Sequence, residues 1–490
     1  MIIQPLPRTR NWLQVLYGAV GLGVGVISGM LVIGVPDALK LFVIVVGVFA
    51  FTVSLARVDW GLLVLIFITY TRFSDVAIKF HGAPSVAKSF ILLLLLAIIA
   101  RWIVFGDRPE GWQKPLLLMI GYGVVGLASI LYAADPQRTI YAIQGFVKDA
   151  LIVVIVAILM RRPDQFRNVA YTLLGAGVFL GTLSIIQFAS GDFGNNFWGF
   201  AQAPVMHIIG DTNSSRTSGP FGNPNDYSQI MLVLFPLALD RLWNEKSRWL
   251  KIFNTYAAAV VLGSVILTFS RSGFVSLVLA GFVFLVYYRP KFSNIVPIML
   301  LGFMLIPFMP REYADRMGTL SLFTPGSNYN PIGEVSLRGR TSEMLVGWMM
   351  FLDRPIFGVG VENYPVYYQE YSRRVGLDPR TEARSPHNLY LEVLAERGLL
   401  GFAFFMLILW MTYRGLREAR RDFLRMEDKN YIGLVTAFSI GVLSYFIGSI
   451  FMHSSYPRFM WLLVGISLAL PQLSRAARER HKKLYGLRFW

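Results

Sequence analysis

The stretch RSPHNLYLEVLAERGLLG, residues 384–401, lies where a long polar segment ends and an apolar helix begins. Pro386 marks a turn, and the residues from Leu389 onward follow a helical pattern. His387 is therefore predicted at or just before a helix N-terminus. The positive end of the helix dipole disfavours imidazolium, so we expect a neutral His387 that can accept a proton near neutral pH.

Two glutamates, Glu392 and Glu396, lie one turn apart on the same face of this otherwise hydrophobic helix. Carboxylates in such a helix are costly unless they are paired or hydrated, which indicates a buried polar site. We expect Glu396 to pair with an arginine of that site, such as Arg271 or the adjacent Arg397. The alternative is an ordinary loop-to-helix junction with polar residues on the surface.

The composition of the chain indicates a helical membrane protein. Of its 490 residues, 55% are hydrophobic and 15% are charged, and the mean hydropathy is +0.52. The chain has no cysteine, which excludes disulfides, zinc–cysteine sites, iron–sulfur clusters and a thiol nucleophile. None of its five histidines is paired at metal-ligand spacing, so we expect neither a metal site nor a cofactor.

Runs of about 20 apolar residues predict the membrane spans. The spans are expected near 13–34, 38–56, 59–71, 87–105, 115–133, 138–160, 168–189, 225–241, 251–270, 272–288, 293–309, 389–412, 430–451 and 457–471. The predicted fold is thus an all-α polytopic membrane protein with about 12–14 transmembrane helices. A large helical periplasmic loop is expected between the eleventh and twelfth spans.

The distribution of lysine and arginine predicts the orientation. The formal net charge is +17, and the basic residues concentrate in alternate short connections and at both ends of the chain. By the positive-inside rule, both termini are expected in the cytoplasm. We expect N-terminal transmembrane helices (1–200), helices with outer-side arginine motifs (201–309), a periplasmic loop domain (310–388), C-terminal transmembrane helices (389–471) and a basic cytoplasmic tail (472–490).

The outer loop contains nine arginines and no lysine. Arginine without lysine suggests bidentate recognition of phosphate or carboxylate, although internal pairing with the acidic residues of the loop is the alternative. Arg338 and Arg340 precede a helical pattern over residues 341–352, with Arg340 on the same face as Trp348. The Gly358-Val-Gly360 motif that follows is more typical of a turn than of a phosphate site.

Two further arginines stand out near the outer ends of predicted spans. Arg271 interrupts a long apolar stretch, where an arginine at mid-bilayer depth costs at least ~2.5 kcal/mol. It is expected to face a cavity just below the outer surface; a tight turn with a snorkelling side chain is the alternative. Arg216 leads a segment rich in Gly, Pro and Asn that forms consecutive turns before the next span.

Four segments between residues 219 and 401 occur in a recognisable order. They are GPFGNPN (219–225), FSRSG (269–273), Arg340 followed by Trp348 and DRPIFGVG (353–360), and HNLYLEVLAERGLLG (387–401). With the large outer loop between them, they resemble the O-antigen ligase and O-antigen polymerase superfamily. These are bacterial inner-membrane proteins that use glycans linked to undecaprenyl diphosphate. The resemblance covers about residues 205–410, and Ser272 is an insertion in the Ser-Arg-Gly turn of the family.

The resemblance implies a metal-independent, inverting glycosyltransferase without a cofactor. In the ligases, arginines that match Arg271 and Arg340 are thought to hold the diphosphate, and the residue that matches His387 to assist the acceptor hydroxyl. We carry these three catalytic roles over. The residues expected to bind substrate are Arg216, Arg338, Asn388 and Glu396.

The expected partners are an undecaprenyl-diphosphate-linked glycan as donor, a lipid or glycan as acceptor, and membrane lipids. Nucleic acid is not expected, because the basic residues are spread over the cytoplasmic connections. Ligase and polymerase differ in the acceptor, and the motifs favour the ligase slightly. A transporter or flippase of lipid-linked sugars is the rival class, but the sequence lacks the related halves typical of transporters.

Overall fold

The structure is a computed structural model that describes residues 57–209, 212–288, 296, 335–377, 384–452 and 457–485. The expected spans near 13–34 and 38–56, and nearly all of the one near 293–309, lie outside these residues. The same holds for 310–334 and 378–383 of the predicted outer loop.

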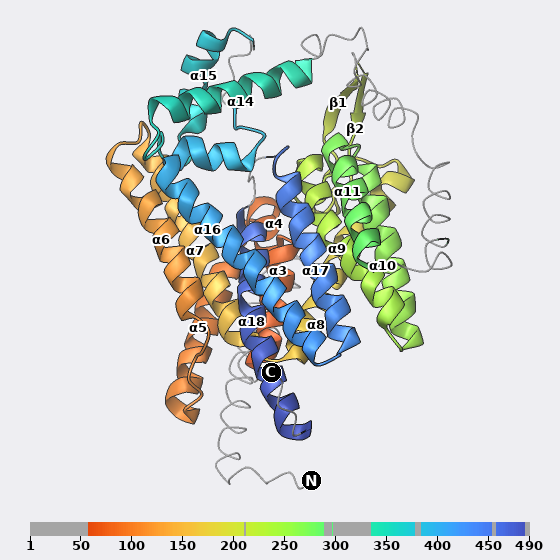
Figure 1. The fold of residues 1–490 in the computed structure, drawn as a ribbon. Helices are drawn as coiled ribbons and strands as arrows, with labels where there is room; N and C mark the ends of the chain where they lie inside the picture. Colours follow the sequence, from red (N-terminus) through yellow and green to blue (C-terminus); the bar gives the residue numbers. More distant parts are fainter. Residues whose placement is uncertain are drawn as a thin grey trace, which may run out of the picture.

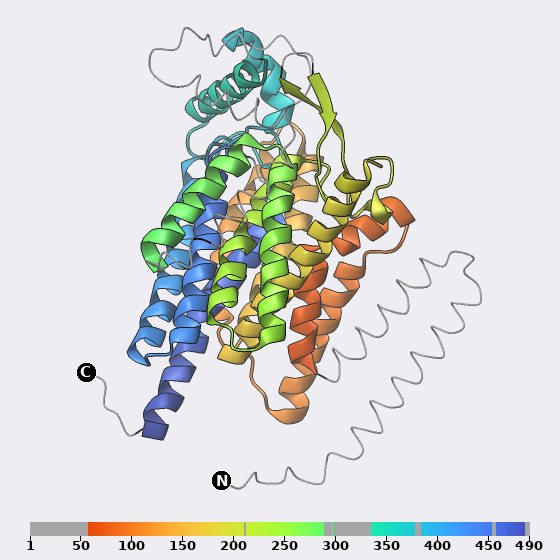
Figure 2. The ribbon, with the colours of Figure 1, turned by 90° about the vertical axis from the view of Figure 1, so that its right-hand side faces the viewer.

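The described residues form a bundle of long helices (Figures 1 and 2). The helices are α3 (Val58–Tyr70), α4 (Phe73–His81), α5 (Val86–Phe105), α6 (Gln113–Ala128), α7 (Pro136–Leu159), α8 (Pro163–Ser190), α9 (Pro224–Asn244), α10 (Arg248–Leu267), α11 (Arg271–Tyr288), α14 (Val335–Asp353), α15 (Tyr364–Val375), α16 (Leu389–Arg425), α17 (Lys429–Gly448) and α18 (Pro457–Tyr485). Within the described part, nine helices are long and apolar enough to cross a membrane, or ten if the bent pair α3 and α4 is one span. The prediction of an all-α polytopic membrane protein is confirmed at this level.

Two local features differ from the sequence-based expectation. The segment before α9 contains an antiparallel hairpin of β1 (Val205–Ile209) and β2 (Thr212–Ser215), which the sequence did not predict. At the other end of the chain, α18 continues to Tyr485, well past residue 471. In this extension Leu473 and Ser474 are buried, and Arg475 and Arg478 form ion pairs with Glu418 and Asp422 of α16.

Helix α9 lies at the centre of the bundle. Every residue from Asp226 to Arg241 is buried. α10 and α17 pack along it, and α8 and α11 also contact it. Because protein rather than lipid surrounds this helix, it can carry polar side chains at both ends.

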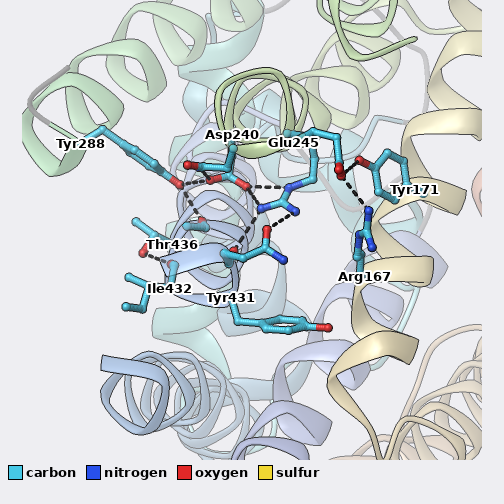
Figure 3. Close-up of polar contacts among 12 residues, drawn as sticks. Arg167, Tyr171, Asp240, Glu245, Tyr288, Tyr431, Ile432 and Thr436 are labelled. Atoms are coloured by element: carbon cyan, nitrogen blue, oxygen red, sulfur yellow. Dashed lines mark hydrogen bonds and ion pairs between the residues drawn. The ribbon is translucent and has the colours of Figure 1, made fainter. Parts of the chain in front are cut away.

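A buried polar network joins the end of α9 to α11 and α17 (Figure 3). Asp240 and Arg241 are both 0% exposed, and the Nε atom of Arg241 donates to Oδ2 of Asp240 over 2.8 Å. Arg241 also donates from Nη1 to Oδ1 of Asn430 over 2.8 Å. The hydroxyl of Tyr288 donates to Oδ1 of Asp240 over 2.9 Å and lies 2.6 Å from the carbonyl of Gly433. Three helices are thus held together at the end of the bundle opposite α14.

Replacing Asp240 by Ala is expected to destabilise the protein by about 3–5 kcal/mol, because it leaves the guanidinium of Arg241 buried without its carboxylate. Thermal unfolding of the purified protein in detergent measures the loss. The matched control is Glu370→Ala, which removes an exposed ion pair to Arg374 of 2.9 Å and should cost about 0.5 kcal/mol or less. Equal unfolding temperatures for the two variants would contradict the buried-charge argument.

Helices α14 and α15 lie across one end of the bundle instead of running along it (Figure 1). They share a small core that includes Val346, Met350, Tyr364 and Tyr368, and Ala395 of α16 closes this core from below. The expected helix over 341–352 is confirmed as part of α14. This layer is therefore anchored on the first turns of α16, where the sequence analysis placed the site.

Candidate functional site

His387 stands immediately before α16. Asn388 is the N-cap of this helix, and its side chain accepts a hydrogen bond from the backbone N–H of Leu391 over 3.0 Å. The backbone N–H of Leu389 donates to the carbonyl of Ser449, at the end of α17, over 2.9 Å. The predicted helix start is confirmed, and Asn388, expected to bind substrate, is used by the fold as a cap.

The nearest partner of His387 is a residue that the sequence analysis missed. Nδ1 of His387 lies 2.6 Å from Oε2 of Glu343, whose side chain is 0% exposed. The other carboxylate oxygen of Glu343 lies 3.0 Å from Nη1 of Arg384. Glu343 is three residues after Arg340 on α14, so the two lie on one helix face. The sequence feature that could have indicated this partner is Glu343 itself, an acidic residue on the same helix face as Arg340.

Tyr364 fixes the backbone beside Glu343. Its hydroxyl donates to the backbone carbonyl of Glu343. Burial, and next the negative charge of Glu343, raise the pKa of Tyr364 well above its usual value, so the hydroxyl stays protonated and keeps donating. Glu343 is therefore held at two points: Tyr364 binds its main-chain carbonyl, and Arg384 contacts its side chain.

The turn between α10 and α11 carries Arg271 as the first residue of α11. Phe269 in this turn has a left-handed φ of 51°, which is strained for an aromatic residue. The hydroxyl of Ser270 donates to Oδ1 of Asn225 over 2.8 Å and accepts from the backbone N–H of Gly273 over 3.1 Å. Two of the recognised motifs, at 219–225 and 269–273, are therefore in direct contact.

The side chain of Arg216 donates hydrogen bonds to the backbone of the same turn. It is 3% exposed, and it donates from Nε to the carbonyl of Thr268 over 2.9 Å and from Nη2 to the carbonyl of Phe269 over 3.3 Å. These contacts with main-chain carbonyls are those of a positioning residue. Arg216 was expected to bind substrate, which stays a prediction; its described contacts hold the turn that presents Arg271.

The segment 353–363 is docked onto a break in α16. Gly398, inside the helix, has φ 61° and ψ −166°. The helical hydrogen bonds lost there are replaced by contacts with the segment: Val359 N–H donates to the carbonyl of Ala395, and Gly360 N–H to that of Glu396, each over 2.9 Å. The Gly358-Val-Gly360 motif is a turn, as expected, and it supports the break in α16.

Glu396 has a different partner from the one expected. Its carboxylate accepts the backbone N–H of Glu362 over 2.9 Å and that of Tyr364 over 3.2 Å. Among the described residues, it forms no ion pair with an arginine. The expectation of an arginine partner was wrong because the two N–H groups of the docked segment satisfy this buried carboxylate. Arg397 instead stacks on the ring of Tyr122, 4.2 Å from its centroid.

Substituting Gly398 by Ala is expected to destabilise the site strongly. A Cβ atom there would lie 2.3 Å from the carbonyl oxygen of Ile356, in a backbone conformation that costs ~1–3 kcal/mol for other residues. Thermal unfolding and limited proteolysis of the 353–363 segment measure the effect. Gly175→Ala is the control, since a Cβ at Gly175 of α8 meets nothing within 4 Å. An unchanged unfolding temperature and cleavage rate for Gly398→Ala would refute the docking argument.

Two cavities flank the start of α16. One, of about 520 Å³, has apolar walls that include Leu345 and Trp348 of α14 and Leu391 of α16, with Asn388 at its edge. The other, of about 230 Å³, has largely apolar walls that also carry charged side chains, among them Glu392 and Glu396. The inference that these two glutamates face one polar site is consistent with this placement.

The structure places His387 in a cluster with two residues that were not predicted. Glu343 contacts both His387 and Arg384, and the predicted Arg340 lies on the Glu343 face of α14. The Nε atom of Arg338 is buried and has no hydrogen-bond partner among the described residues. The turn that carries Arg271 lies at the same end of the bundle as α14, on a separate pair of helices (Figures 1 and 2). Within the described ranges, no group of three or more His, Asp or Glu is placed to hold a metal ion.

Comparison with known proteins finds a family match, which overlaps this part of the chain. The family model described as O-antigen ligase matches residues 256–406, which run from α10 through the turn at Arg271, α14 and the first half of α16. No curated protein matches the chain. The matched segment contains His387, Glu343, Arg340 and Arg271. Over residues 256–406, the chain is therefore similar to the O-antigen ligase family.

Proposed function

We propose that the protein transfers a glycan from a polyprenyl diphosphate to an acceptor hydroxyl, with inversion at the anomeric carbon. The observation that carries the proposal is the pair of His387 and the fully buried Glu343, 2.6 Å apart, at the start of α16. A carboxylate that accepts a hydrogen bond from one imidazole nitrogen fixes the tautomer in which the other nitrogen is a base. Nδ1 faces Glu343, so Nε2 is the nitrogen that takes the proton.

The reaction then has one proton transfer and one displacement. Nε2 of His387 removes the proton from the acceptor hydroxyl as its oxygen attacks the anomeric carbon. The bond from that carbon to the diphosphate oxygen breaks, and polyprenyl diphosphate leaves with the electron pair. The carboxylate of Glu343 stabilises the imidazolium that forms.

The diphosphate needs positive charge where its own negative charge develops. Arg271 is the first residue of α11, where free backbone N–H groups and the helix dipole also favour an anion. Arg340 extends from α14 on the same face as Glu343. We assign the diphosphate to Arg271 and Arg340, and we assign to Arg216 the support of the turn that carries Arg271.

The two cavities suggest where the rest of each substrate lies. The apolar cavity with Trp348 and Leu391 in its walls suits a polyprenyl chain, because its lining removes hydrocarbon from water. The smaller cavity, with Glu362 and Glu392 among its lining residues, suits a sugar, whose hydroxyls donate to carboxylates. Both cavities border the residues that follow His387.

The test is an in vitro reaction of purified protein in detergent with a polyprenyl-diphosphate-linked glycan and candidate acceptors, without nucleotide. Glycan attached to the acceptor is expected, and a metal chelator should leave the rate unchanged. Attachment to a lipid or core-sugar acceptor indicates a ligase, and growth of a lipid-linked chain indicates a polymerase. Absence of product together with movement of the donor across a vesicle membrane would mean a transporter and would overturn the proposal.

A further inference from the structure

The second half of α16 forms a strongly basic groove with α18, far from the His387 site. The groove has a volume of about 500 Å³ and lies at the end of the bundle where α18 extends beyond the other helices (Figure 1). It is lined by Trp410, Tyr413, Arg414, Arg417, Glu418, Arg421, Asp422, Arg425 and Arg478. We call this feature the arginine groove.

The acidic residues of the arginine groove are already engaged by α18. Asp422 accepts from Nη1 of Arg478 over 2.9 Å and from the hydroxyl of Ser474 over 2.9 Å. Glu418 accepts from Nε of Arg475 over 2.7 Å. These bonds hold α16 and α18 side by side and leave little negative charge for the arginines of α16.

Three arginines of α16 therefore remain available to a ligand. Arg414, Arg417 and Arg421 are exposed, and within the described ranges none of them has a hydrogen-bond or ion-pair partner. Their spacing of three and four residues places them on one face of the helix. Guanidinium groups in a row present planar pairs of N–H donors, which match phosphate oxygens.

The neighbouring residues of α16 place this positive charge at the depth of lipid headgroups. Trp410 is 52% exposed and Tyr413 is 59% exposed, and they directly precede the arginines. Met406 and Leu407, one turn earlier, are also exposed, as side chains that face lipid tails would be. Trp and Tyr favour the boundary between lipid tails and water, and basic pockets between helices at this level bind anionic headgroups.

We propose that the arginine groove binds the phosphate of an anionic phospholipid headgroup, with Arg414, Arg417 and Arg421 as its ligands. The same chemistry could recognise a soluble phosphate. The aromatic residues and the exposed apolar surface that border the groove favour the lipid. This site is separate from the proposed transfer reaction and does not depend on it.

The experiment measures lipid retained by the purified protein in detergent, using native mass spectrometry. Phosphatidylglycerol is compared with zwitterionic phosphatidylcholine, and inorganic diphosphate serves as the soluble anion. Wild-type protein is expected to retain phosphatidylglycerol preferentially. Binding should weaken about fivefold for each arginine removed, and hence about 25-fold for the double variant Arg417→Gln and Arg421→Gln.

The matched control is the double variant Arg248→Gln and Lys251→Gln. It removes the same charge at the same end of the bundle, from the first turn of α10, outside the groove. An equal loss in both double variants would mean unspecific attraction and would overturn the site. So would equal retention of phosphatidylcholine and phosphatidylglycerol, or diphosphate that displaces the lipid at equal concentration. Because no transfer reaction is measured, failure of the proposed function would leave this result intact.

Discussion

His387→Ala is expected to lower the rate of glycan transfer by about 10²–10⁴-fold, the usual contribution of a positioned general base. The protein should remain folded, because Asn388 caps α16 and Leu389 anchors it to Ser449 without the imidazole. The measurement is the initial rate of transfer to acceptor in the detergent reaction, together with thermal unfolding.

The control for this prediction is His81→Ala. His81 lies in α4, and its Nε2 atom is 3.0 Å from the carbonyl of Trp198, in a contact unrelated to the proposed site. It should keep nearly all of the transfer rate. If His387→Ala also kept most of its activity while folded, His387 would not be the base.

Glu343→Gln is expected to lower kcat by about 10–150-fold. The substitution preserves the size of the side chain but removes the charge that stabilises the imidazolium of His387. A charge-assisted hydrogen bond contributes ~1.5–3 kcal/mol, which corresponds to this range of rates. The amide can also donate to Nδ1, which would favour the tautomer with the proton on Nε2 and block the base.

A purely structural role for Glu343 predicts a different result. In that case the unfolding temperature would fall and the KM for the donor would rise along with the loss of kcat. We expect kcat to fall alone, because Tyr364 still holds the backbone carbonyl of residue 343. Glu370→Gln, on the exposed face of α15, is the matched control and should have no effect on kcat.

Much of this architecture could be predicted from local patterns. Apolar runs of helical length located α5–α8, α10, α11, α16 and α17, because a span needs an almost continuous apolar surface. The start of α16 at Leu389, with His387 just before it, followed from Pro386 and the change in polarity. The order of four short motifs indicated a resemblance to the superfamily, and the match of residues 256–406 to the O-antigen ligase family model agrees with it.

The interactions of the candidate site could not be predicted in this way. Glu343 contacts His387 across 44 residues, and Arg216 reaches the carbonyl of Thr268 across 52. Glu396 binds backbone N–H groups more than 30 residues earlier, so no side-chain pattern could indicate its partner. The spacing of apolar residues predicts which face of a single helix is apolar, because residues three and four positions apart share a helix face. Which carboxylate meets which cation depends on how helices pack, and neighbours three and four residues apart do not determine that packing.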